Sequence, residues 1–135
     1  MNKEINQNNR FINLIIKNKI MERNISESPQ KWVIIKIGGD SPHYRVFGEW
    51  LGGYLGDDRW KVNSGISKVY EDETFYYFEG FSGSCYRCRK DSYGFKDELL
   101  SFGSYAGGIL ENLIENSEGK INIESESLDF INLIK

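Results

Sequence analysis

Between residues 31 and 90 the chain alternates short apolar runs, rich in β-branched and aromatic residues, with clusters of Gly, Ser, Asp and Pro. Runs of this kind, bounded by turn residues, predict short strands joined by tight turns. Residues 74–78 carry aromatic side chains at successive positions, which is typical of a central strand covered on both faces. The expected strands are 31–37 (KWVIIKI), 43–47 (HYRVF), 59–62 (RWKV), 66–70 (ISKVY), 74–78 (TFYYF) and 85–90 (CYRCRK).

The pattern changes in the last third of the chain. Apolar residues stand at positions 109, 110, 113 and 114, with Glu and Asn between them, and this spacing predicts an amphipathic helix. The pair Gly107-Gly108 is expected near its start or at a bend, and Gly119 is placed to end it. Residues 120–124 (KINIE) alternate as an edge strand does.

These elements indicate an α+β fold, in which residues 31–90 form a small, strongly bent antiparallel sheet or barrel of about 5–6 strands. A C-terminal amphipathic helix follows it, and residues 30–135 are expected to form one domain. Residues 1–29 are expected to be an N-terminal extension, because 14 of the first 20 positions are Asn, Ile or Lys. This extension is either partly disordered or a short helix, and a further hypothesis places the translation start at Met21.

Composition narrows the class of protein. With 135 residues, 39% hydrophobic and 14% aromatic, the chain has the size and apolar content of one globular domain. No apolar run approaches the roughly 18 residues of a membrane span, and two cysteines are too few for a disulfide-stapled secreted miniprotein. The N-terminus lacks the pattern of a signal peptide. We therefore expect a cytoplasmic protein that does not engage a membrane.

Cys85 and Cys88 form a C-x-x-C, the spacing of redox and zinc sites. The segment has the pattern of a strand, on which residues three apart point to opposite faces at a distance of about 10 Å. That separation exceeds the reach of a disulfide, and a second ligand pair for zinc is missing. We therefore expect packing roles, with one sulfur buried and the other near the surface, and no metal site.

The catalytic inventory is small. His43 is the only histidine, so any His-based acid–base chemistry would have to use it. Residues 80–84 (GFSGS) depart from the G-x-S-x-G nucleophile motif at their last position, and no phosphate-binding glycine loop is present. We therefore name no catalytic residue and no cofactor, and expect a protein that is not an enzyme.

Glycines at positions 48, 52, 53 and 56 surround Trp50 and Tyr54. Such density marks either a sharp bend of a small sheet or a loop that presents the two aromatic side chains to a partner. Both interpretations are kept.

Charge is distributed unevenly: residues 1–30 carry +2, residues 31–95 are neutral and residues 96–135 carry −5. The leading hypothesis is therefore a small acidic protein that binds a basic protein partner without catalysis, of the inhibitor, immunity or phage anti-defence type. Its contacts would be Glu111, Glu115 and Glu118 on and just beyond the helix, together with Trp50 and Tyr54. The oligomeric state stays open.

Two alternatives remain. The first is a small β-barrel that binds nucleic acid or nucleotides through basic and aromatic side chains on adjacent strands, namely Trp60, Tyr86, Arg87 and Arg89. The neutral charge of residues 31–95 speaks against it. The second alternative is a small enzyme or ligand-sequestering protein without a recognisable motif.

Overall fold

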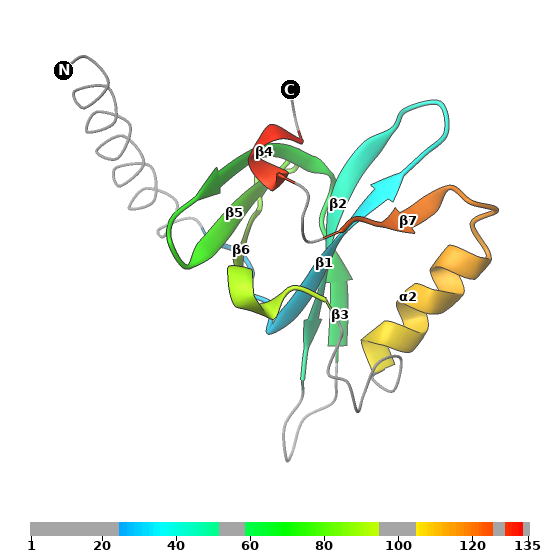
Figure 1. Cartoon of the computed structure of the whole chain (residues 1–135), viewed down its shortest axis with the longest axis horizontal. Helices are drawn as coiled ribbons and strands as arrows, with labels where there is room; N and C mark the ends of the chain where they lie inside the picture. Colours follow the sequence, from blue (N-terminus) through cyan, green and yellow to red (C-terminus); the bar gives the residue numbers. More distant parts are fainter. Residues whose placement is uncertain (1–24, 52–58, 95–104, 126–128, 134–135) are drawn as a thin grey trace.

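The computed structural model describes residues 25–51, 59–94, 105–125 and 129–133 (Figure 1). The expectations for a helix within residues 1–24 and for a start at Met21 lie outside these ranges. Two short 3₁₀ turns accompany the regular elements, at Lys90–Ser92 and Phe130–Asn132. The regular elements are β1 (Lys31–Ile37), β2 (His43–Trp50), β3 (Arg59–Val62), β4 (Ile66–Glu71), β5 (Phe75–Gly80), β6 (Cys85–Arg89), α2 (Tyr105–Glu115) and β7 (Ile121–Ile123).

The strands form two antiparallel sheets, which we call sheet B (order β3-β2-β1-β7) and sheet A (order β4-β5-β6). All six expected strands are present, the expected edge strand is β7, and the amphipathic helix is confirmed as α2. The helix already begins at Tyr105, so Gly107 and Gly108 lie within its first turn. The single bent sheet or barrel is corrected, because the described strands divide into two sheets that do not close.

The division arises at the short connection from β3 to β4. Asn63, directly after β3, bonds both backbone groups of Val46 on β2. Its backbone N–H donates to the Val46 carbonyl (3.0 Å), and its side-chain Oδ1 accepts a hydrogen bond from the Val46 N–H (2.8 Å). Gly65 then adopts φ +114°, a conformation that favours glycine, and the chain leaves sheet B. The next strand therefore pairs with β5 in sheet A.

The two sheets enclose the larger core cluster. Trp32 is fully buried at its centre, with ring centroids 4.8 Å from Tyr93 and 5.3 Å from Phe78. Its indole N–H donates to the Arg89 carbonyl at 2.7 Å. Phe130, from the C-terminal 3₁₀ turn, closes the cluster at 5.7 Å from Trp32. The aromatic content of the chain is thus concentrated between the sheets.

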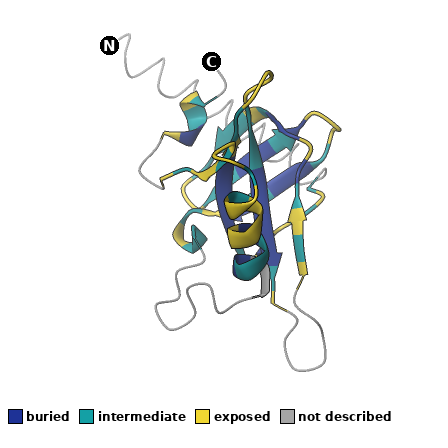
Figure 2. Cartoon of the chain, turned by 90° about the vertical axis from the view of Figure 1, so that its right-hand side faces the viewer, coloured by how far each residue is buried: buried dark blue, intermediate teal, exposed yellow. Residues whose placement is uncertain are grey.

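The other face of sheet B is covered by α2 (Figure 2). Val33 and Ile35 alternate with Trp32 and Ile34 along β1, so one strand contributes to both cores and both of its faces are buried. Leu110, 1% exposed, is the side chain of α2 that packs deepest against Val33, Ile35 and Phe47.

Residues 25–29, assigned to the extension by composition, lie against the domain. The Ser26 N–H donates to the Cys85 carbonyl (2.9 Å), and the Arg87 N–H donates to the Glu27 carbonyl (2.9 Å). This segment therefore pairs alongside β6 in parallel, and Pro29 is buried beside Gly48. It covers an edge of sheet A that would otherwise be open.

Candidate partner-binding surface

The polar face of α2 points to solvent and carries acidic side chains. Glu111 and Glu115 are exposed and four residues apart, which places them on the same side of the helix. Leu113 is 38% exposed on this outward half, whereas Leu110 and Ile114 pack against sheet B. Figure 2 shows the exposed residues of α2 along its outer side.

Glu118 continues the acidic surface beyond the helix. It has φ +56°, which makes it the one non-glycine residue with a positive φ in the described part of the chain. Its turn is held by Ser117, whose hydroxyl donates to the Ile114 carbonyl (2.7 Å) and accepts the Ile121 N–H (3.1 Å). Gly119, at φ +82°, leads into β7. This turn keeps Glu118 exposed directly next to the helix end.

Acidic residues outnumber basic ones in the described segment that carries this surface. Residues 105–125 contain four Glu and one Lys. None of the ion pairs formed among the described residues involves Glu111, Glu115 or Glu118. We call these three residues, with Leu113 beside them, the acidic surface.

Trp50 does not stand on an exposed loop in this structure. It ends β2, is half-buried, and packs against the cluster between the sheets. The Arg59 guanidinium lies over its ring at 5.0 Å. Tyr54, its expected companion, lies outside the described residues. The contribution of both residues to partner binding remains a prediction.

The four residues of the nucleic-acid hypothesis lie on different faces. Trp60 stacks on Phe47 (centroids 5.4 Å apart, planes at 6°) on the α2 side of sheet B. Tyr86 is 4% exposed between the sheets, and burial, with smaller contributions from Glu27 and Cys88, raises its pKa to about 12. Arg87 and Arg89 extend from the outer face of sheet A. The four side chains are therefore on three different faces and form no common surface.

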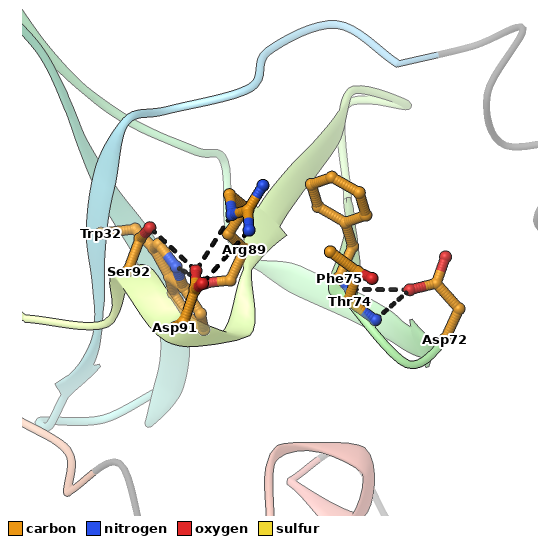
Figure 3. Close-up of polar contacts among 7 residues, drawn as sticks. All are labelled: Trp32, Asp72, Thr74, Phe75, Arg89, Asp91 and Ser92. Carbon is orange, nitrogen blue, oxygen red and sulfur yellow. Dashed lines mark hydrogen bonds and ion pairs between the residues drawn. The ribbon is translucent and has the colours of Figure 1, made fainter.

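Arg87 and Arg89 share one aromatic neighbour. Their guanidinium carbons lie 4.9 Å and 6.0 Å from the Phe75 ring centroid. Arg89 also pairs with Asp91 through two hydrogen bonds of 3.0 and 3.2 Å (Figure 3). That hydrogen-bonded pair lowers the pKa of the Asp91 carboxyl. An acidic side chain thus accompanies a basic one on this face. The ion pair of Lys90 with Glu71 (3.7 Å) lies on the opposite face of sheet A, where the Lys90 ammonium is 4.8 Å from the Tyr76 ring centroid.

The expected opposite orientation of Cys85 and Cys88 is confirmed, since Cys88 belongs to the core between the sheets and Cys85 to a small cluster on the outer face of sheet A. The expectation that one sulfur lies near the surface is wrong, because both are buried. Residues 25–29 and Tyr77 account for this by covering Cys85. Burial, opposed only in part by Arg87, raises the pKa of Cys85 to about 11.

His43 has both ring nitrogens engaged. Its Nε2 accepts from the Arg45 side chain (2.8 Å), so Nδ1 carries the proton and donates to the Ser41 carbonyl (2.8 Å). Within the residues that the structure describes, no three His, Cys, Asp or Glu side chains gather closely enough for a metal ion. Over the same ranges no helix is long and apolar enough to cross a bilayer.

Two features of this region were not singled out from the sequence. The sequence predicts the edge strand but not that Ile123, on β7 beside α2, is 42% exposed. The left-handed conformation of Glu118 had no signal, since glutamate does not favour it. Comparison of the chain with protein-family models, curated proteins and solved structures finds no match.

Proposed function

We propose that the protein is a non-catalytic binding protein whose acidic surface occupies a basic surface on another protein, as an inhibitor does. One observation carries the proposal: Glu111, Glu115 and Glu118 occupy positions where an acidic residue makes α2 and the turn after it less stable. Residues retained against local stability are typical of functional positions, because stability and function are often in conflict there.

Three unfavourable contributions to the free energy of folding support this interpretation of the three glutamates. Like charges at i and i+4 on a helix are unfavourable by about 0.2–0.5 kcal/mol. Glu115 is the last residue of α2, where the helix dipole favours a base, at a cost of about 0.3–1 kcal/mol. Glu118 holds a left-handed conformation that costs a non-glycine residue roughly 1 kcal/mol.

Among the described residues no base forms an ion pair with these carboxylates, which supports a basic partner. An exposed group of carboxylates without bases attracts a basic surface over a distance of about a Debye length and raises the association rate. Leu113 adds an apolar contact within the same surface. A basic protein surface with a small apolar centre is therefore the complement that this face fits.

The test begins with capture of the partner from host lysate, with and without nuclease, and identification by mass spectrometry. Affinity for that partner is then measured for the Glu111→Lys/Glu115→Lys variant. The matched control is Glu73→Lys/Asp91→Lys, which changes the net charge equally at two exposed positions in the connections of sheet A, the sheet on the other side of sheet B from α2. We expect the α2 variant to bind at least about 10-fold more weakly, with a smaller salt dependence.

The same α2 variant should be at least as stable to urea as the unmodified chain, because it removes an unfavourable pair. Equal losses of affinity in both variants would indicate only a general charge effect and contradict the proposal. A captured partner that disappears with nuclease would favour the nucleic-acid alternative instead.

A further inference from the structure

Among the described strands, β7 stands at the end of sheet B and pairs only with β1. The Gly38 N–H donates to the Lys120 carbonyl, and the Glu124 N–H donates to the Ile34 carbonyl (2.8 Å). Antiparallel ladders alternate, so positions 120, 122 and 124 direct their backbone groups toward β1. The backbone groups of Ile121 and Ile123 therefore point away from β1, toward the edge of sheet B.

Most of these outward groups have no partner in the described part of the chain. The Ile121 N–H is satisfied by the Ser117 hydroxyl. The Ile121 carbonyl and both backbone groups of Ile123 accept or donate no hydrogen bond among the described residues. The Ile123 side chain is 42% exposed on the α2 side of the sheet, beside the half-buried Ile121. Exposed edges with an apolar side chain are templates for an added strand.

We propose that an extended, basic segment of the partner adds to sheet B along β7, which rests on the function proposed above. Glu118 precedes β7 and Glu124 follows it, so acids stand at both ends of the edge, with Lys120 as the one base between them. A second copy of this chain would bring its own acids against these. Charge therefore selects a partner strand that carries Lys or Arg.

This pairing would define how the partner is recognised. Backbone hydrogen bonds from Ile121 and Ile123 would fix the direction and register of the added strand, without regard to its sequence. Alternate side chains of that strand would contact Ile123 and the acidic surface, because successive residues of a strand point to opposite faces. Extended conformation and positive charge are thus required together.

The probe is a synthetic alternating Lys-Val octapeptide, with a Glu-Val octapeptide as its control, titrated into the full chain while amide resonances are recorded. We expect the Lys-Val peptide to shift the amides of residues 121–124 and to slow hydrogen exchange at Ile123. The decisive variant is Ile123→Pro, which removes the outward N–H and leaves the bonds to β1 intact. We expect it to weaken binding at least about 10-fold.

Ile123→Val is the matched control, since it retains the N–H and the preference for a strand. Ile123→Lys, which places a base on the edge, serves in place of the proline variant if that variant fails to fold. Peptide binding that is lost in Glu111→Lys/Glu115→Lys but unchanged in Ile123→Pro would overturn edge pairing and leave the proposed function standing. No binding of the Lys-Val peptide, or a free chain that is a dimer through this edge, would also overturn the inference.

Discussion

The two faces of β1 are packed in different ways. Toward sheet A, Trp32 meets a set of aromatic rings, of which Phe78 and Phe130 are themselves fully buried, and a hydrogen bond from its indole fixes its orientation. Toward α2, Val33 and Ile35 are covered by a single 11-residue helix that leaves Leu113 and the acidic surface exposed. The first face is built for stability, and the second combines packing with presentation of a surface.

The difference shows how a small domain divides its roles. The core between the sheets uses contributions from both sheets and from the C-terminal turn, so that Phe130 secures the end of the described chain. The α2 layer rests chiefly on Leu110. Side chains can therefore change along the outer side of α2 without disturbing the larger core.

The largest effect is expected where the aromatic core is broken. Trp32→Ala removes the central ring and leaves a cavity, and we expect a loss of about 3–5 kcal/mol in the free energy of unfolding. Urea denaturation followed by circular dichroism measures it. Trp60→Ala is the matched control, since that ring is half-exposed at the edge strand β3. Equal losses in the two variants would contradict the central role of Trp32.

Within α2, Leu110→Ala and Leu113→Ala test the comparison in one helix. Leu110 is 1% exposed and Leu113 is 38% exposed. We expect Leu110→Ala to cost about 2–4 kcal/mol and Leu113→Ala less than about 1 kcal/mol. In partner binding the same two variants should behave in the opposite order, because the proposed function places only the exposed Leu113 at the partner. Similar stability losses would mean that α2 packs on sheet B with a different face.

How far the sequence predicts this fold depends on the range of the interactions. The run 31–37 (KWVIIKI) predicts a strand, and the aromatic residues 74–78 predict one covered on both faces, because hydrophobic pattern is a local signal. That β1 is also buried on both faces is known only from the structure. The separation into two sheets depends on Asn63, whose side chain pairs with Val46 seventeen residues away. Nothing local distinguishes that asparagine from one in an ordinary turn.

The candidate site divides in the same way. Glu111 and Glu115 could be placed on the outer side of a helix from spacing alone. Tyr86 has the same strand pattern as an exposed aromatic residue, and only its partners across the two sheets show that it is buried. Which backbone groups of β7 point away from β1 depends on the register of the two strands. That register cannot be deduced from the sequence of β7 alone.

A smaller effect concerns Asp72, whose carboxylate, unlike those of the acidic surface, is engaged within its own sheet. Burial alone would raise the pKa of Asp72, but hydrogen bonds from the Phe75 N–H (2.7 Å), the Tyr77 hydroxyl (2.8 Å) and the Thr74 N–H (2.8 Å) outweigh it and lower the pKa. Figure 3 shows the two backbone contacts.

A lowered pKa in the folded state means that the ionised carboxylate stabilises the fold above the ordinary Asp pKa. This contribution is lost as the pH falls through the lower, folded value. Asp72→Asn should therefore be less stable at neutral pH and should lose part of the decline in stability between roughly pH 5 and pH 2. Urea titrations across that range measure it, with Tyr77→Phe expected to show a partial effect. An unchanged acid decline in Asp72→Asn would exclude this role.

The smallest expected change in stability is at Glu118, where the contribution of a residue to stability can be separated from its contribution to partner binding. Glu118→Gly removes both a left-handed glutamate and an acid close to the end of α2, so we expect the chain to become more stable, by about 1 kcal/mol. Glu118→Ala keeps the backbone strain and removes only the charge, so it should gain less. Thermal unfolding of the two variants compares them.

Both variants should weaken binding of the partner to a similar degree, because each removes the same carboxylate from the acidic surface. A gain in stability combined with a loss of affinity is expected only of a residue retained for its contact with a partner. If Glu118→Gly were more stable and bound equally well, the left-handed glutamate would be a tolerated feature of the turn. The acidic surface would then be limited to the two glutamates of α2.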